Sequence, residues 1–501
     1  MQAEVYHSHE IQAWERRWFS QQNSAFGLMQ QAAWSIVQHL HLRFQNNYPE
    51  VKTIAVWCGR GNNAGDGYCI ASYLKQSGYV VEIFAAEIGA STDLKQAIQL
   101  AQQNQLKIHS DFDLQASFDC HIDALFGIGL NRDLDQAWQT IIQNFNTQTG
   151  IKIAVDLPSG LNANTGQPQP IATKVDYTFT ILGLKAGLFT GQGKEYSGQI
   201  ETISLIPTDS ALKAVAQLAP QQIQLPQRQA FGHKGSYGHV LVVGGHADMG
   251  GAVILAAESA FCAGAGKVTI VCHQKHHTAI LARSPNIMVK DINVLTEDEI
   301  QSLINHVDTV SFGMGLGRDD WAEQQFSKWF KPICASTHLQ VVFDADALWF
   351  LATQNTQLSP NTYLTPHPGE AAKLLDCSIA EIESDRIAAI HRLKKKYSGN
   401  WVLKGAGSLI LEDKLWICTA GNPGMGTGGM GDVLAGMIAS LKAQFAENVQ
   451  LHDIVTLHAQ AGDYLAQQGV RGLQAQHMAH AVYRVINSCQ EKNRQCMRLN
   501  C

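Results

Sequence analysis

Short apolar runs rich in β-branched residues alternate with longer polar-apolar segments along most of the chain. The short runs predict buried strands, and the segments between them carry the period of amphipathic helices. Strands that alternate with helices form parallel sheets, because each crossover between parallel strands needs a long connection. We therefore predict an α/β protein built from three-layer α/β/α domains. The expected strands are 53–58, 80–85, 120–126, 151–157 and 177–182 in the first half, and 239–243, 267–272, 309–313, 340–344 and 401–403 in the second.

This alternation lapses once, between Ile206 and Gln229. The chain there reads PTDSALKAVAQLAPQQIQLPQRQ, with three prolines and many glutamines. Such composition is typical of a connection between domains. A chain of 501 residues is also too long for one hydrophobic core. We predict two domains, residues 1–225 and 226–501.

The most informative motif of the second half is NPGMGTGGMGDVLAG, residues 422–436. Backbone N–H groups in a glycine-rich turn, together with the N-terminus of the following helix, form a site for a phosphoryl group. A carboxylate there repels phosphate unless it takes a proton from the hydroxyl under attack. Asp432 is therefore the predicted base of a phosphoryl transfer. The alternative is that Asp432 only caps the helix.

The first half has polar residues after three of its expected strands. The motifs are GRGNNAGDG (59–67), DALFGIGLNRD (123–133) and DLPSG (156–160). Ligands of open parallel sheets bind beyond the carboxyl ends of the strands, so we expect these polar residues at one rim. The chain has neither the G-x-G-x-x-G fingerprint nor a Walker A motif there, and each aspartate alone would be a turn former. The residues expected at the rim are Asn62, Asn63, Asp66, Asp123, Asp156 and Ser159.

Composition limits the classes of binding partner and the cellular compartment that we expect for this protein. The net charge of −6 argues against nucleic acid or an anionic membrane as a partner. Eleven cysteines without a C-x-x-C pair indicate neither a disulfide framework nor a zinc site, so we expect a cytoplasmic protein with reduced thiols. The polar start, MQAEVYHSHE, predicts no signal peptide, and no apolar stretch is long enough to span a membrane.

Taken together, these motifs resemble two known families. GNNAGDG, D-x-LFG-x-GLNR and DLPSGL are similar to the YjeF N-terminal family, the NAD(P)H-hydrate epimerases. KGSYGHVLVVGG, GGAVILAAESAFCAGAG, FDADAL, TPHPGE, KGAGSLI and the 422–436 motif resemble the ADP-dependent NAD(P)H-hydrate dehydratases. The resemblance covers nearly the whole chain. It implies a Rossmann-like N-terminal domain and a ribokinase-like C-terminal domain.

The resemblance also implies a chemistry. NAD(P)H that has gained water across a ring double bond exists as R and S epimers and no longer donates hydride. The second half would phosphorylate the hydroxyl of the S epimer at the expense of ADP, giving AMP, phosphate and NAD(P)H. The first half would interconvert the epimers. Expected cofactors are potassium in the first half and magnesium with the nucleotide in the second, and a homo-oligomer is expected.

Site residues of the first half follow from the resemblance by position. Asp156 matches the acid/base, and Asn63, Asp123 and Ser159 match potassium ligands, all of them oxygen donors. Ala64 stands where the family usually has glycine, which bars an easy positive φ. The positions that match substrate contacts are Asn62, Asn63, Ala64, Gly65, Asp66, Gly127, Ile128, Gly129, Leu130, Asn131, Arg132, Asp133 and Asp156.

In the second half the same carry-over gives a substrate site and a nucleotide site. Trp349 departs from the asparagine that relatives often carry, and Asp344 with Asp346 is a candidate magnesium pair of which one member would be a structural cap. Asp432 matches the base. The substrate contacts are Ala252, Gly315, His367 and Asp432. The nucleotide contacts are Lys404, Gly405, Ala406, Gly407, Ser408 and Gly431.

Two other functions stay open from the residues alone. A sugar or vitamin kinase of the ribokinase superfamily would use the same glycine-rich loop and base but release a stable phosphorylated product. Alternatively, the first half is a nucleotide-sensing or protein-binding module, a hypothesis that the presence of Asp123 and Asp156 disfavours.

Overall fold

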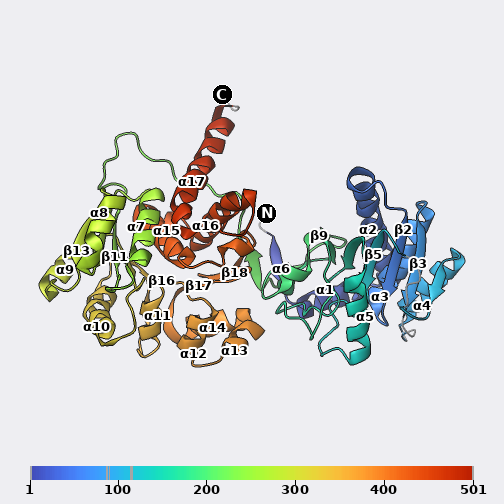
Figure 1. Cartoon of the computed structure of the whole chain (residues 1–501). Coiled ribbons are helices and arrows are strands. Elements are labelled where there is room, and N and C mark those ends of the chain that lie inside the picture. The colour runs from blue at the N-terminus through green and yellow to red at the C-terminus, as the bar shows by residue number, and fades with distance from the viewer. Residues whose placement is uncertain (1–2, 86–88, 90, 113–116, 499–501) are drawn as a thin grey trace. The chain divides into compact units, whose positions relative to one another are not determined.

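A computed structural model describes residues 3–85, 89, 91–112 and 117–498. Its contacts divide the chain into two compact units, Ala3–Gln217 and Leu218–Cys501. Figure 1 shows both units as α/β structures with helices packed on sheets. The predicted fold class is confirmed. Each unit is described separately below.

Unit 1 contains a seven-stranded parallel sheet in the order β4-β3-β2-β5-β6-β7-β9. All five strands expected in this half are present, some one or two residues shorter at their ends. The strands are β2 (Thr53–Cys58), β3 (Val80–Ala85), β4 (Lys107–His109), β5 (Cys120–Ala124), β6 (Ile151–Val155), β7 (Tyr177–Ile181) and β9 (Gln199–Ile203), with β1 (Glu4–Tyr6) and β8 (Leu184–Lys185) pairing outside this sheet. The helices are α1 (Ser8–Ser20), α2 (Ala25–Asn47), α3 (Asn62–Gln76), α4 (Thr92–Gln103), α5 (Gln136–Thr147) and α6 (Gly193–Tyr196).

The three layers of unit 1 follow from side-chain alternation along its strands. In β2, Ile54 and Val56 pack with residues of α2, α3 and α4, whereas Trp57 packs with Trp138 and Phe145 of α5. Successive side chains of a strand point to opposite faces, so a strand covered on both faces is apolar throughout. This arrangement places the loops after β2, β5 and β6 at one edge of the sheet.

Unit 2 contains a nine-stranded run in the order β13-β12-β11-β14-β15-β16-β17-β18-β19. Pairing is parallel from β13 to β17 and antiparallel in the β17-β18-β19 meander. The strands are β11 (His239–Val243), β12 (Lys267–Cys272), β13 (Met288–Asp291), β14 (Thr309–Phe312), β15 (Gln340–Phe343), β16 (Leu358–Leu364), β17 (Ser398–Leu403), β18 (Ser408–Leu411) and β19 (Leu415–Cys418). The chain passes from unit 1 to unit 2 within β10 (Ala216–Leu218).

Helices of unit 2 cover its sheet with two separate apolar groups. Residues of α7, α15, α16 and α17 form one core with strands β11 and β12. Stacked phenylalanines from α10 and α11, among them Phe326 and Phe350, pack with Phe312 and Phe343. The helices are α7 (Gly250–Cys262), α8 (His277–Arg283), α9 (Glu297–Asn305), α10 (Asp320–Ala335), α11 (Asp346–Leu351), α12 (Pro368–Leu375), α13 (Ile379–Ser384), α14 (Arg386–Tyr397), α15 (Met430–Phe445), α16 (Leu451–Leu465) and α17 (Ala475–Arg498).

Among the described residues, no helix is both long and apolar enough to cross a membrane.

Candidate active sites

Unit 1 has a cavity of about 750 Å³ at the carboxyl edge of its sheet. The predicted residues that line it are Asn62, Asn63, Asp66, Gly127, Ile128, Gly129, Leu130, Asn131, Arg132 and Asp156. Three predicted substrate contacts lie elsewhere: Ala64 and Gly65 are buried inside α3, and Asp133 is exposed beyond the lining segment. The convergence expected from the strand ends is therefore present for most of the set.

The segment 59–67 is a loop only in its first part. Gly61 is the N-cap of α3, which begins at Asn62. The prediction of a glycine-rich loop is therefore wrong from Asn62 onward. Ala64 is helical and is absent from the residues with positive φ. Its methyl group is therefore compatible with the local backbone, because a helix does not need glycine there.

Asp156 is held in place by a lysine that sequence analysis did not identify. Asp156 has a φ of 69°, in the left-handed region, and its N–H donates to the Phe179 carbonyl at 2.8 Å. Its Oδ1 accepts hydrogen bonds from the Lys185 ammonium and, at 3.1 Å, from the Ile181 N–H. A Cβ on Gly127 would lie 3.3 Å from Asp156 Oδ2, which places that second oxygen toward the cavity-lining loop. One carboxylate oxygen is thus fixed while the other faces Gly127.

The three predicted potassium ligands are buried, and two of them are bonded to each other. Ser159 Oγ donates to Asp123 Oδ1 at 2.6 Å, and Asp123 Oδ2 accepts from Ser159 N and Thr173 Oγ1. The Asn63 amide is buried, and its Nδ2 has no hydrogen-bond partner among the described residues. The Asp123 carboxylate, the Ser159 hydroxyl and the Asn63 amide oxygen are donors that a hard cation accepts, whereas the unpaired Asn63 Nδ2 would need a hydrogen-bond acceptor instead.

In unit 2 the glycine-rich motif does lead into a helix. Gly429 caps α15 with φ 93°, which a side chain would strain, and Asp432 lies in the first turn. The first N–H groups of a helix have no partner within it and attract anions. The Asp432 carboxyl accepts no hydrogen bond from a described residue, and burial followed by the nearby Asp344 carboxylate raises its pKa to about 7. A carboxyl with that pKa is suited to proton transfer near neutral pH.

Lys404 lies at the centre of an acidic cluster beside this helix. Its Nζ donates to Asp344 Oδ1 at 2.9 Å and lies 3.8 Å from Glu370 Oε2. Burial disfavours the ammonium, but the two carboxylates outweigh burial and raise the pKa of Lys404. A Cβ on Gly431 would lie 3.1 Å from the same Nζ, so Lys404 and the glycine-rich loop are adjacent.

The remaining nucleotide positions form a tight turn after Lys404. Gly405 has φ 149° and Gly407 has φ 64°, and the Ser408 hydroxyl donates to the Gly405 carbonyl at 3.0 Å. Ala406 lies between the two glycines, where β17 and β18 are joined. The turn brings residues 404–408 together, as expected for a binding loop.

The two candidate magnesium carboxylates differ in their contacts. Asp346 is fully engaged, because its oxygens accept from Gly317 N at 2.9 Å and Arg318 Nε at 2.8 Å. Asp344 Oδ1 accepts from Lys404 and Thr365, whereas its Oδ2 accepts from no described residue and lies 3.5 Å from where a Gly431 Cβ would be. Asp344 therefore has an oxygen that fits a magnesium ion, whereas Asp346 is structural and bonds to residues 317–318 rather than capping a helix. No group of three or more His, Cys, Asp or Glu side chains among the described residues is arranged for a metal, so phosphates would complete the shell.

Two of the four predicted hydrate contacts of unit 2, Gly315 and Ala252, are neighbours. A Cβ on Gly315, whose φ is 60°, would lie 3.2 Å from the Cβ of Ala252. His367 caps α12, and its Nδ1 accepts from the N–H groups of Gly369 and Glu370 at 3.0 and 3.3 Å. Because Nδ1 is an acceptor, the neutral ring carries its proton on Nε2. His367 is thus a capping residue as well as a candidate substrate contact.

Trp349, which replaces the usual asparagine, lies under two cations. The Arg318 guanidinium carbon is 4.3 Å from its ring centroid and the Lys373 Nζ is 4.7 Å from it. The tryptophan is about one-third exposed. It therefore packs as a cation–π platform rather than as a polar contact.

Sequence analysis missed Lys185, Glu15 and Glu370. Lys185 is the only charged residue in the apolar run ILGLKAGLF (181–189), and a lone charge in such a run indicates a buried, paired group. Glu15 lies on a helix whose relation to the site depends on tertiary packing, so no local pattern identifies it. Glu370 ends the TPHPGE motif and forms a capping box with His367, a local signal that could have identified it.

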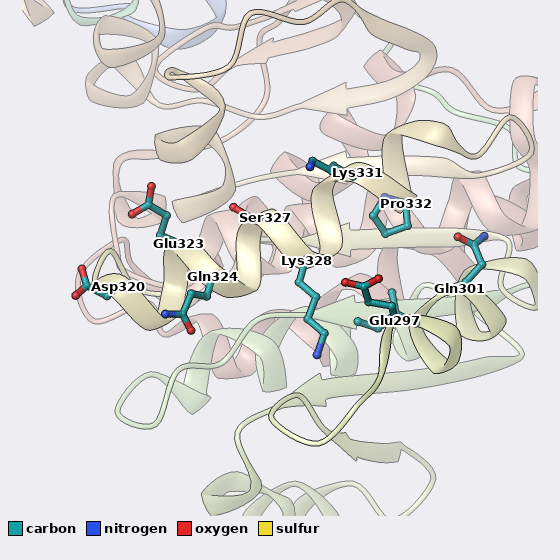
Figure 2. A pocket seen from close by; sticks show the side chains of 10 residues that line it. Glu297, Gln301, Asp320, Glu323, Gln324, Ser327, Lys328, Lys331 and Pro332 are labelled. Carbon is teal, nitrogen blue, oxygen red and sulfur yellow. The ribbon is translucent and has the colours of Figure 1, made fainter.

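A second cavity, of about 880 Å³, lies between α9 and α10 of unit 2. Figure 2 shows Lys328 and Glu297 on facing elements of this groove. Its walls contain none of the residues predicted for either site.

Comparisons with known proteins match one family to each unit. The sequence model of the family described as YjeF-related protein N-terminus matches residues 25–187, and that of NAD(P)H-hydrate dehydratase matches residues 240–484. Among solved structures, an ADP/ATP-dependent NAD(P)H-hydrate dehydratase from Bacillus subtilis is 24% identical with a TM-score of 0.47, covering 54% of this chain and 96% of that one.

Two relatives match over the length of both units. The bifunctional NAD(P)H-hydrate repair enzyme Nnr of Coxiella burnetii is 36% identical over 489 residues, which cover 94% of this chain and 97% of the relative. Nnr of Escherichia coli is 36% identical over 458 residues, 88% of this chain and 86% of the relative. The chain belongs to the family of bifunctional NAD(P)H-hydrate repair enzymes.

Proposed function

We propose that the chain repairs hydrated NADH and NADPH in two steps, epimerisation in residues 1–225 and ADP-dependent dehydration of the S epimer in residues 226–501. The observation that carries the proposal is the pairing of the two sites in one chain. The rival kinase function explains the Asp432 site but gives no role to the Asp156 cavity, and the family assignment covers both.

In the dehydratase step, the chain activates a poor leaving group. Asp432 would take the proton of the substrate hydroxyl as phosphate is transferred to its oxygen, because its carboxyl is free and next to the anion-binding helix terminus. Lys404, Gly431 and the turn 405–408 would bind the nucleotide phosphates, and Ala252, Gly315 and His367 would contact the hydrate. Asp344 would hold magnesium, which neutralises phosphate charge when bound. Phosphate then leaves with elimination, and the ring double bond is restored.

In the epimerase step, Asp156 would act as acid/base on a hydrate bound in the unit 1 cavity. Residues 62–66 and 127–133 would surround that substrate. Asn63, Asp123 and Ser159 would hold potassium, whose charge would support an anionic group of the substrate. The Asp123–Ser159 hydrogen bond joins β5 to the loop after β6 and supports this role.

We further propose a cytoplasmic location and a homo-oligomeric state. The side chains of seven described cysteines form no disulfide bond, which agrees with a reducing compartment: Cys58, Cys69, Cys120, Cys262, Cys272, Cys334 and Cys377. Light scattering of the purified protein would measure the oligomeric state.

The proposal is tested with a mixture of R and S NADH hydrate, ADP or ATP, magnesium and potassium. Absorbance of the reduced nicotinamide ring should recover completely, with AMP and phosphate formed from ADP. A stable phosphorylated product without recovery of absorbance would favour the kinase alternative.

A further inference from the structure

The epimerase cavity contains ionisable groups that the proposed mechanism leaves without a role. Glu15 of α1, Asp66 of α3, Asp156 and Lys185 all line it. Arg16 and Arg132 line the same cavity, as does Asp93. All belong to unit 1. Of these groups, the proposed mechanism assigns proton transfer only to Asp156.

Lys185 is not available as a second proton-transfer group. Its Nζ donates to Asp156 Oδ1, to Thr180 Oγ1 at 3.0 Å and to the Ile181 carbonyl at 2.6 Å. An ammonium has three protons, and all three are used. The lysine therefore holds the Asp156 carboxylate in position and has no free proton to donate to a substrate.

Glu15 has the opposite character. It is half-buried, lines the cavity, and its carboxyl makes no hydrogen bond to any described residue. Burial, followed by the negative charge of Asp156, raises the pKa of Glu15 to about 7, against the opposing effects of Lys185 and Arg16. Such a group is protonated about half the time at neutral pH and free to meet a ligand.

Asp66 is less suited to the same role. Burial raises its pKa well above the usual range, and the charges of Asp156 and Glu15 act in the same direction. An acid that holds its proton so firmly donates a hydrogen bond but exchanges the proton slowly. Asp66 thus serves better as a fixed donor beside the bound ring.

Epimerisation of the hydrate needs two proton-transfer groups. Water adds to the enamine of the ring at the carbon next to nitrogen, so the nitrogen lone pair can expel the hydroxyl once that oxygen is protonated. The C–O bond breaks, water leaves and a C=N⁺ bond forms. A second water then attacks the opposite face, a C–O bond forms, the electron pair returns to nitrogen, and the attacking water loses a proton. No oxidant or reductant is involved, and one proton passes from the acid to the base.

We infer that Glu15 is the second catalytic residue of the epimerase, the general acid that protonates the departing hydroxyl of the R epimer while Asp156 accepts the proton of the incoming water. This inference rests on the proposed function. The assignment of roles follows from the contacts: Asp156 is ion-paired with Lys185, whereas the Glu15 carboxyl has no cation bonded to it. The R epimer is the one that the dehydratase leaves behind, so its conversion starts from this resting state. Solvent exchange returns the proton from Asp156 to Glu15.

The test uses the full chain and Glu15→Gln, with Glu10→Gln on the same helix as the matched control. The substrate is mixed NADH hydrate epimers with ADP, and the slow phase of NADH recovery reports R-to-S conversion. Glu15→Gln should slow that phase about 10²-fold or more, with the fast S-epimer phase unchanged. Glu10→Gln should leave both phases unchanged.

The pH profile separates a proton donor from a structural residue. In the wild type the slow phase should fall tenfold per pH unit above about 7, because Glu15 loses its proton there. Glu15→Asp should be slower but keep a falling limb, whereas Glu15→Gln should lose it. A Glu15→Gln rate within threefold of wild type, or a wild-type profile flat between pH 6 and 8.5, would overturn the inference. Wild-type protein without any R-epimer conversion would instead contradict the proposed function itself.

Discussion

Each unit pairs a lysine with an aspartate, and the two pairs differ in how many of the lysine protons are used. In unit 1 the side chains of Lys185 and Asp156 are 1% and 10% exposed, and Lys185 has three protein acceptors. In unit 2 the side chain of Lys404 is 21% exposed and donates one hydrogen bond to a described residue, Asp344. A lysine whose donors are all used fixes a catalytic carboxylate, whereas one with free donors can bind an incoming phosphate.

The same difference separates the two catalytic aspartates. Asp156 is bonded to its lysine, but Asp432 has no such bond because Lys404 is turned to Asp344 and Glu370. Burial therefore raises the pKa of Asp432 to about 7, because the opposing effect of Lys404 is smaller. Burial raises the pKa of the proposed base of unit 2, whereas an ion pair with Lys185 fixes the position of the proposed acid/base of unit 1.

Removal of the unit 2 base should have the largest effect. Asp432→Asn keeps the shape of the side chain but cannot accept the proton, so dehydration of the S epimer should fall about 10²- to 10⁴-fold. Calorimetry should show nucleotide affinity nearly unchanged, and Asp413→Asn in the β18–β19 turn is the surface control. A rate within a few-fold of wild type would show that Asp432 is only a cap.

Replacement of each lysine by methionine tests the comparison directly. Lys185→Met leaves a buried carboxylate without its partner and should destabilise unit 1 by about 3–5 kcal/mol. Lys404→Met should cost less stability but weaken nucleotide binding about tenfold to hundredfold, as expected for a lost charged hydrogen bond. Urea unfolding and calorimetry measure the two quantities. Equal loss of stability with unchanged nucleotide affinity would contradict the distinction.

The pH dependence of the dehydratase rate should follow the ionisation of its proposed base, Asp432. Asp432 must be ionised, so kcat/KM for the S epimer should fall tenfold per unit as the pH drops below about 7. This slope is opposite in sign to that expected for the epimerase. Initial rates with pure S epimer between pH 5.5 and 8.5 measure it, and a rate that rises toward acid pH would refute the assignment.

Replacement of Trp349 should have the smallest effect on activity and stability. Its contacts with Arg318 and Lys373 are cation–π interactions worth about 0.5–1 kcal/mol each at an exposed site. Trp349→Asn, the residue usual in relatives, should lower the stability of unit 2 by about 1–2 kcal/mol and leave kcat within threefold. Thermal unfolding and steady-state kinetics would show whether the change instead removes activity.

Sequence patterns predicted the parallel strands and the helix that follows the glycine-rich turn at 422–436, because both are encoded locally. Runs such as 53–58 and 239–243 are apolar on both faces, and the 422–436 motif carries its own helix start. The partners of these residues were harder to predict. Lys185 and Asp156 are 29 residues apart, and Lys404 and Asp344 are 60 apart. Such pairs depend on the order of strands in the sheet, and this order cannot be predicted from local sequence patterns.

The helix beginning at Asn62 was missed for a related reason. The glycines of 59–67 favour a loop, but Gly61 alone supplies the N-cap, and the following residues pack in the core of unit 1. Burial of Ala64, Tyr68 and Cys69 outweighs the weak local preference.

The central claim, two independent sites in one repair pathway, is tested most directly by mixing two inactivated full-length proteins. Asp156→Asn should convert only the S epimer in a fast phase and leave a long tail, while Asp432→Asn should restore almost no NADH. Together they should convert the mixed epimers completely, because the first supplies the dehydratase and the second the epimerase. Fast, complete conversion by Asp156→Asn alone, or a tail that persists in the mixture, would contradict the account.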